Sequence, residues 1–284
     1  MKGIIFMKRE KIIGIAVLIM FFCQILPVIG ASVSSAQESS PPIPMTRATH
    51  KVNGTGGGDY TSIQAAVDAA ASGDVIEVDP GTYRENVLIT EKSLTIRGAD
   101  PSTTIIDGSE VGVGINLMSS NNRIESIRVR NSEHGIKISS TENNIITDCH
   151  LVYNSFTGIR LSGGRYNTIT DSLCSRNEYG IRLYDSCDDN TISGNRCENN
   201  TFGIYIQNSD NNTITDNICK YNEVSTRTRE VYFSAGIYAN GDCHYNSLSS
   251  NTCSSNGEYG FYIYQSNRNT IEENICKNNK NDGF

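Results

Sequence analysis

The sequence lacks an excess of basic charge, and it has no tryptophan among its 284 residues. Its formal net charge is −7. Residues 1–36 hold four basic residues and one acidic residue, a net charge of +3, so the remainder carries −10. A protein that binds nucleic acid needs a basic footprint. The acidic remainder therefore argues against a nucleic-acid partner.

Residues 114–284 consist of one short unit that is repeated. The unit opens on Gly-Ile or Gly-Phe, and its opening glycines are Gly114, Gly135, Gly158, Gly180, Gly203, Gly236 and Gly260. Neighbouring glycines are 21, 23, 22, 23, 33 and 24 residues apart. A period of this length is typical of stacked repeats. We expect an all-β fold, a single-stranded right-handed parallel β-helix in which one unit forms one rung.

Three kinds of column recur in every rung. Apolar residues stand one and three positions after the glycine and two positions after an asparagine, a strand-like alternation that predicts inward side chains. Asparagine columns indicate turns and ladders of side-chain amides. A cysteine column holds Cys174, Cys197, Cys219, Cys253 and Cys276. In-register neighbours suit disulfide geometry poorly, so we expect free thiols in the core.

The N-terminal part divides into three segments. Residues 1–36 read as a secretory signal peptide, with an uncleaved membrane anchor as the alternative, and residues 37–48 as a flexible linker. Residues 49–113 are expected to form the cap and the first rungs, beginning with a strand at His50–Asn53. A helix is predicted from Ser62 to about Ala71, with Thr61 as its N-cap and Gly73 at its end. Further strands are predicted at Val75–Val78, Asn86–Ile89, Leu94–Ile96 and Thr104–Ile106.

The helix segment Asp59–Val67 and the segment Pro80–Asn86 carry a resemblance to known proteins. Their order resembles the opening of pectin-lyase-like β-helix proteins, including surface and periplasmic proteins of the NosD type, described as carbohydrate-binding and sugar-hydrolysis modules. The opening is shared by pectin methylesterases, and it marks architecture more than activity. The NosD resemblance implies copper.

The outward positions carry the first candidate site. We call it the outer stripe: Lys137, Arg160, Arg182, Tyr184, Tyr205, Tyr238, Tyr262 and Tyr264. Tyrosine rings stack on sugars and arginine forks carboxylates or sulfates, which indicates a glycan-binding surface. The alternative is a solvated strand face whose Tyr and Arg favour β structure. The long spacing after Gly203 predicts a loop at 223–233 beside the stripe, carrying Arg227, Arg229, Tyr232 and Phe233.

A second candidate lies in the turn after the first strand of each rung. Cys187, Asp210, Cys243 and His244 occupy this turn on successive rungs. Such residues are ligands for transition metals, so a metal site is one hypothesis, and the NosD resemblance implies that the metal would be copper. Scattered polar turn residues are the alternative.

Motifs for catalysis are missing. Polygalacturonate hydrolases of this architecture use clustered aspartates before a Gly-His-Gly, whereas here Asp188-Asp189 follows His134-Gly135. No pair of carboxylates faces outward on adjacent rungs, as glycoside hydrolysis requires. Arg160 and Arg182 resemble the bases of calcium-dependent lyases, but no acid cluster stands beside them. We therefore expect no catalytic residue and no cofactor, with copper or calcium as the alternative.

These observations predict a secreted or cell-surface module, periplasmic in a cell with two membranes. We expect a non-catalytic protein that binds a polysaccharide or cell-surface glycan and meets a membrane only through an N-terminal anchor. The alternatives are a polysaccharide lyase or glycoside hydrolase, and a NosD-type periplasmic copper-handling protein. Gly283-Phe284 repeat the start of a rung, so we expect further rungs or a further domain beyond them.

Overall fold

The computed structural model describes residues 47–224 and 233–281. The expected signal peptide at 1–36 lies outside the described residues, as do Arg227, Arg229 and Tyr232 of the expected loop. The division of the N-terminal part into signal peptide, linker and cap stays a prediction. The described chain is all-β apart from one short helix.

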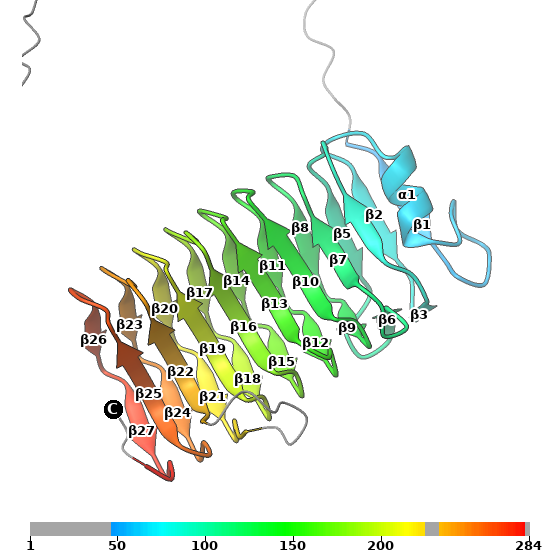
Figure 1. The fold of residues 1–284 in the computed structure, drawn as a ribbon. Coiled ribbons are helices and arrows are strands. Elements are labelled where there is room, and N and C mark those ends of the chain that lie inside the picture. Colours follow the sequence, from blue (N-terminus) through cyan, green and yellow to red (C-terminus); the bar gives the residue numbers. More distant parts are fainter. Residues whose placement is uncertain (1–46, 225–232, 282–284) are drawn as a thin grey trace, which may run out of the picture. The chain divides into compact units, whose positions relative to one another are not determined.

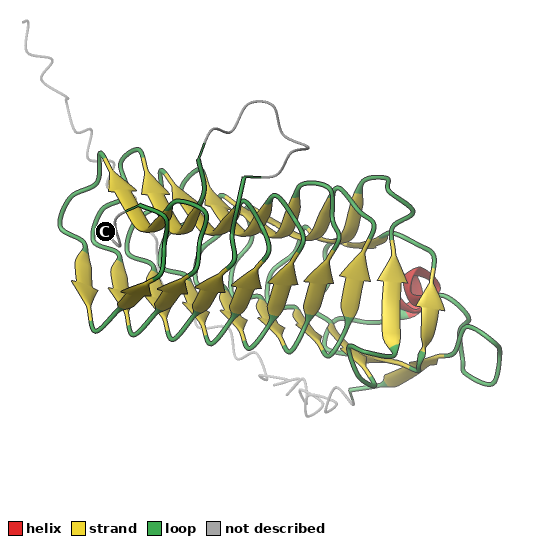
Figure 2. Cartoon of the chain, turned by 90° about the horizontal axis from the view of Figure 1, so that it is seen from below, coloured by secondary structure: helices red, strands yellow, loops and turns green. Residues whose placement is uncertain are grey.

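Three parallel sheets are built from the rungs, and each complete rung adds one strand to each sheet (Figures 1 and 2). The ten-stranded sheet contains β1 (Thr49–Val52), β2 (Val75–Val78), β5 (Thr95–Gly98), β8 (Arg123–Glu125), β11 (Ile145–Thr147), β14 (Thr168–Thr170), β17 (Thr191–Ser193), β20 (Thr213–Thr215), β23 (Ser247–Ser249) and β26 (Thr270–Glu272). The eight-stranded sheet contains β4 (Val87–Ile89), β7 (Val113–Leu117), β10 (His134–Ser139), β13 (Thr157–Ser162), β16 (Tyr179–Tyr184), β19 (Phe202–Gln207), β22 (Ala235–Asn240) and β25 (Tyr259–Tyr264). The nine-stranded sheet contains β3 (Gly81–Tyr83), β6 (Thr104–Asp107), β9 (Arg128–Arg130), β12 (His150–Val152), β15 (Leu173–Ser175), β18 (Arg196–Glu198), β21 (Ile218–Lys220), β24 (Thr252–Ser254) and β27 (Ile275–Lys277). The predicted right-handed parallel β-helix is confirmed.

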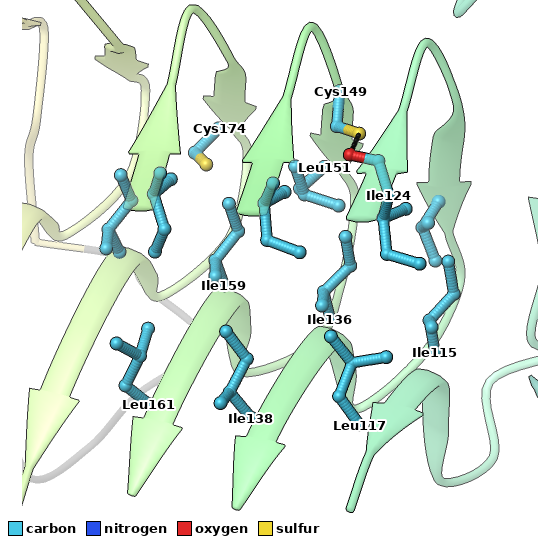
Figure 3. Close-up of a cluster of buried hydrophobic side chains, with 14 of the residues drawn as sticks. Ile115, Leu117, Ile124, Ile136, Ile138, Cys149, Leu151, Ile159, Leu161 and Cys174 are labelled. Atoms are coloured by element: carbon cyan, nitrogen blue, oxygen red, sulfur yellow. Dashed lines mark hydrogen bonds between the residues drawn. The ribbon is translucent and has the colours of Figure 1, made fainter. Parts of the chain in front are cut away.

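Aliphatic columns fill the interior. Ile136 pairs with Ile115 on one side and with Ile159 on the other, and all three are fully buried (Figure 3). Like residues stack on like residues because every rung repeats the same inward positions. The predicted inward columns are therefore confirmed.

Asparagine side chains form ladders between the rungs. The Asn167 Oδ1 accepts hydrogen bonds from the Asn144 backbone nitrogen at 2.9 Å and from the Asn144 Nδ2 at 3.1 Å. The Asn190 Oδ1 takes the same two bonds from Asn167. The ladders satisfy buried polar groups at the turns, as the asparagine columns predicted.

The cysteine column lies in the core. Cys174 pairs in register with Cys197, and both are fully buried. All eight cysteines of the described residues are free thiols, and Cys276 alone is only partly buried. Burial raises the pKa of the Cys276 thiol to about 11 and that of Cys149 to about 12. The thiols are therefore core residues that stay protonated at neutral pH.

The single helix, α1, spans Ile63–Ala69 and packs against β1, β2 and β4 at the N-terminal end of the stack (Figure 1). Its N-cap is Ser62, whose hydroxyl accepts a hydrogen bond from the Ala65 nitrogen at 3.2 Å. The prediction of Thr61 as the cap was wrong by one residue. The Glu85 carboxylate accepts bonds from the Ile63 and Gln64 nitrogens at 2.8 Å each, which fixes the start of the helix. The predicted strands all occur within two residues of their expected bounds, and β3 was not predicted.

Candidate functional site

The outer stripe lies on the outward face of the eight-stranded sheet. Along this sheet Lys137 pairs with Arg160, Arg160 with Arg182, and Arg182 with Tyr205. The row continues through Tyr238 to Tyr262. Tyr184 and Tyr264 lie two residues after Arg182 and Tyr262 on the same strands. In the sheet, Gln207 and Asn240 occupy the paired positions between these two tyrosines. The structure thus brings the eight residues of the stripe onto one face.

A second outward row was not found from the sequence. It consists of the residues before the opening glycines: His134, Thr157, Tyr179, Phe202, Ala235 and Tyr259. We call it the pre-glycine row.

The geometry around Gly180 explains why this row faces outward. A Cβ on Gly180 would lie 2.4 Å from the Gly203 carbonyl oxygen and 3.2 Å from the Cys197 Cβ, so the glycine faces the interior. Ile181 is buried in the core as well. Two consecutive inward residues shift the alternation by one, which moves Tyr179 to the outside. Strict alternation after the glycine misses this shift, although the aromatic residues at Tyr179, Phe202 and Tyr259 were a readable signal.

The aromatic end of the face is a packed cluster. Tyr179, Phe202, Ala235 and Tyr238 are buried in it, with Phe156, Tyr205, Phe233, Tyr259 and Tyr262 packed against them. The ring centroids of Tyr238 and Tyr262 are 5.5 Å apart at 18°, and those of Tyr205 and Tyr238 are 4.9 Å apart. Tyr238 is 7% exposed, whereas Tyr264 is 50% exposed. The rings therefore turn their faces toward one another and offer a ligand less stacking surface than the sequence predicted.

Of the four loop residues predicted for the site, Phe233 is the one that lies among the described residues. Its ring centroid lies 5.5 Å from that of Phe202 and 5.3 Å from that of Tyr238. It therefore packs onto the aromatic cluster and links the loop position to the outer stripe.

A carboxylate lies beside the basic end of the face but not on its cations: the Glu133 Oε1 is 3.7 Å from the His134 Nε2. Among the described residues, no carboxylate lies within 4.0 Å of the charged nitrogens of Lys137, Arg160 or Arg182. The Arg182 guanidinium carbon instead lies 4.8 Å from the ring centroids of both Tyr179 and Tyr184. Cation–π contacts of this kind hold the guanidinium in place without neutralising it.

His134 lies beneath this basic end and is 3% exposed. Its Nε2 is 3.0 Å from the Arg160 Nη1. Burial, together with the charges of Arg160, Lys137 and Arg182, lowers the pKa of His134 to about 4. The imidazole is therefore neutral at pH 7.

The four turn residues of the second candidate do not converge. The Cys187 and Cys243 sulfurs are buried and lie 3.2 Å and 3.4 Å from the carbonyl oxygens of Tyr184 and Asn240. The Asp210 Oδ1 accepts a hydrogen bond from the His244 backbone nitrogen at 2.6 Å. Metal binding by these four residues stays a prediction.

Comparison with models of protein families identifies the family of this chain. The model of the family described as periplasmic copper-binding protein (NosD) matches residues 67–241, more than half of the sequence. The chain belongs to the NosD family. This confirms the resemblance stated from Asp59–Val67 and Pro80–Asn86. A search of curated proteins gave no match.

Solved structures share the fold of this NosD-family chain. Pectate lyase Pel9A has 16% identity and a TM-score of 0.55, covering 82% of this chain and 71% of its own. The D317A mutant of the periplasmic alginate epimerase AlgG has 19% identity and a TM-score of 0.58, covering 71% and 51%. Tailspike protein 2 of the Escherichia coli O157:H7 bacteriophage CAB120 has 14% identity and a TM-score of 0.63, covering 72% and 30%. The chain thus spans about half of the epimerase and under a third of the tailspike, and the likeness shows the fold alone.

The name of the NosD family implies copper, which binds to histidine, cysteine and methionine. Over residues 47–224 and 233–281, no three His, Cys, Asp or Glu side chains come together in a way that could hold a metal ion. The thiols of Cys149, Cys174 and Cys253 lie in the core, where burial raises their pKa and disfavours the thiolate that metals bind. Among the described residues no cluster of three such side chains is therefore arranged to hold copper, and copper binding stays a prediction.

Nor does any helix in the described part of the chain have the length and apolar character needed to cross a membrane.

Proposed function

We propose that this protein binds a polysaccharide along the outer face of the eight-stranded sheet, as a secreted or periplasmic β-helix module. The observation that carries the proposal is the continuous row from Lys137 to Tyr262, which is in register over six rungs. With rungs spaced ~4.8 Å apart, the row is roughly 24 Å long. A straight row of polar groups at a regular spacing suits a linear polymer better than a small compact ligand.

The contacts expected are mainly polar. Because the Tyr205, Tyr238 and Tyr262 rings cover one another, a sugar chain would meet their hydroxyl groups and ring edges. Lys137, Arg160 and Arg182 add charged donors at the other end of the row. Two of the structural relatives are named for pectate and alginate, which are polysaccharides, and this supports the proposed ligand class without establishing it.

Binding to a glycan array, followed by calorimetry on the best ligand, tests the proposal. The double variant Tyr205→Phe/Tyr262→Phe keeps the ring packing and removes two hydroxyl groups. If each hydroxyl contributes about 1 kcal/mol, binding weakens roughly tenfold to thirtyfold. The matched control is Tyr153→Phe/Tyr221→Phe, two half-exposed tyrosines on a different edge of the coil. No glycan binding by the parent protein, or equal losses in the two double variants, would refute the proposed face.

Cleavage of the bound glycan is measured in the same samples. A non-catalytic module leaves the chain length of the polysaccharide unchanged over hours, with or without Ca²⁺. New chain ends would identify a lyase or hydrolase and replace the binding role with a catalytic one.

A further inference from the structure

We infer that the basic end of the outer stripe holds an anionic group, a carboxylate or a sulfate, of the bound polysaccharide. This inference rests on the proposed function and names the chemical class of its ligand. The site, which we call the anion seat, consists of Lys137, Arg160 and Arg182 from the outer stripe and His134 and Thr157 from the pre-glycine row.

Buried polar atoms without partners gather at this seat. Eight buried side-chain polar atoms of the described residues have no hydrogen-bond partner, and six of them belong to strands β7, β10, β13 and β16. Four of the six belong to the seat: the His134 Nδ1, the Thr157 Oγ1, the Arg160 Nε and the Arg182 Nε. The other two, the Asn116 Oδ1 and the Ser139 Oγ, lie outside it on β7 and β10. Native proteins satisfy most buried polar groups, so such a concentration needs an explanation. A bound ligand supplies one.

The position of the single proton on the neutral His134 ring makes the unpaired Nδ1 a hydrogen-bond donor. Arginine has only donor groups, so the His134 Nε2 must accept the bond from the Arg160 Nη1. The neutral ring then carries its single proton on Nδ1, which has no partner. Arg160 therefore sets the tautomer of His134, and the unpaired group is an N–H.

The unpaired groups of the seat match an anion. The His134 Nδ1–H and the Nε–H groups of Arg160 and Arg182 can only donate, and the fully buried Thr157 hydroxyl can donate too. The Asn116 Oδ1 at the edge of this set is an acceptor and is the exception. The Glu133 carboxylate lies 3.7 Å from the His134 Nε2 and offsets part of the charge of the three cations. The seat keeps a net positive charge, which repels a positively charged ligand and attracts a negative one. Charge-assisted hydrogen bonds to such a group are among the strong ones.

The experiment compares ligands that differ only in charge. Oligogalacturonate and its methyl ester share a backbone, as do a sulfated glycan and its desulfated form, so the two pairs separate a carboxylate from a sulfate. We expect the acidic member of one pair to bind at least tenfold more tightly, with an affinity that falls as salt is raised. Equal affinity for charged and uncharged members would overturn the anion seat and leave the proposed function standing. A protein that binds no polysaccharide at all overturns both.

Variants then locate the anion. Arg160→Gln should weaken acidic-glycan binding roughly tenfold or more and weaken neutral-glycan binding by a clearly smaller factor. Arg196→Gln on β18 is the matched control, because Arg196 pairs with Glu198 on a different sheet. Equal losses in the two arginine variants would place the anion elsewhere.

Thr157→Val keeps the shape of a buried side chain and removes one unpaired hydroxyl. We expect the ligand-free protein to keep or gain thermal stability and its affinity for the acidic glycan to fall severalfold. A variant that loses stability without losing affinity would show that the hydroxyl serves the fold, against the seat.

Discussion

Each asparagine of the ladders joins three rungs through its side chain. The Asn200 Oδ1 accepts hydrogen bonds from the Asn177 backbone nitrogen and Nδ2, at 2.9 Å and 3.2 Å. The Asn200 Nδ2 donates to the Cys174 carbonyl oxygen at 3.0 Å and to the Asn222 Oδ1 at 3.3 Å. The side chain is buried, and all four bonds form without water. The ladder thus satisfies turns that would otherwise bury unpaired backbone groups.

Replacing Asn200 should therefore destabilise the coil. Asn200→Ala removes four hydrogen bonds and leaves the buried Asn177 backbone nitrogen without its acceptor. We expect a loss of roughly 2–4 kcal/mol in the free energy of unfolding, measured by urea denaturation. The control Asn267→Ala changes an exposed asparagine and should stay within about 0.5 kcal/mol. A small loss at Asn200 would mean that the ladder is dispensable.

Residue roles could be read from the sequence wherever the repeat kept its alternation. Ile, Asn and Cys columns recur at fixed offsets, so their burial followed from counting. The pre-glycine row was missed because Gly180 and Ile181 both face inward, and counting from the glycine cannot show that step. The tautomer of His134 could not be predicted from the sequence either, because it depends on the hydrogen bond with Arg160 in the next rung.

At the scale of elements, α1 begins where tertiary contacts fix it. Thr61 and Ser62 are both favourable N-caps by residue type, with serine somewhat preferred. The Glu85 carboxylate, more than 20 residues away in sequence, takes the first two helical N–H groups, and Ser62 takes that of Ala65. Local sequence cannot choose between the two hydroxyls because the deciding partner belongs to another rung.

The two hydroxyls can be compared directly. Ser62→Ala removes the hydrogen bond to the Ala65 nitrogen and should cost about 1 kcal/mol of stability. Thr61→Ala, at an exposed position just before the cap residue, should change stability by less than about 0.5 kcal/mol. Thermal unfolding of both variants is the measurement. A larger effect at Thr61 would restore the assignment made from sequence.

A buried carboxylate joins the first two strands of the ten-stranded sheet. Asp74, which precedes β2, accepts a bond from the His50 Nε2 of β1 at 2.9 Å and bonds from the Ala48 and Ala71 nitrogens, also at 2.9 Å. The hydrogen bond from His50 is the main cause that lowers the pKa of Asp74 below its ordinary value of 3.8. Folding therefore favours the ionised carboxylate.

This shift predicts the direction of an acid effect. A carboxylate with a lowered pKa stabilises the fold fully above its unfolded-state pKa and loses that contribution as the pH falls through the folded-state pKa. The stability of the parent protein should thus fall below about pH 4. Asp74→Asn should be less stable at pH 7 and show a smaller fall in acid, whereas the exposed control Asp216→Asn should titrate like the parent. An unchanged acid profile in Asp74→Asn would assign the effect to other carboxylates.

At the scale of the whole coil, the repeat is sufficient to predict the architecture. A period of 21 to 24 residues, interrupted once by the longer spacing after Gly203, with Ile at fixed offsets predicts both the rung and the stacking of rungs. The outer stripe followed as well, because in-register rungs place equal offsets in one row. The packing of Tyr205, Tyr238 and Tyr262 face to face did not follow, since ring orientation depends on Phe202 and Phe233 beside them.

Stacked rungs exchange contacts only with their neighbours, so the cost of losing a core side chain should depend on its place in the stack. Ile192 and Ile271 are the middle residues of β17 and β26 in the same sheet, and they occupy the same position in their rungs. Ile192 lies between Ile169 and Ile214 and is fully buried, whereas Ile271 is 40% exposed and has Leu248 as its one partner in the described sheet.

Truncating these two side chains tests the additive picture of the coil. Ile192→Ala should cost 2–5 kcal/mol through lost burial and a cavity that rigid neighbouring rungs cannot fill. Ile271→Ala should cost about 1 kcal/mol, because much of the side chain is already in water. Urea unfolding gives both values for the same sheet position and the same chemical change. Equal costs would contradict nearest-neighbour stacking and indicate that the stability of the coil is shared along its whole length.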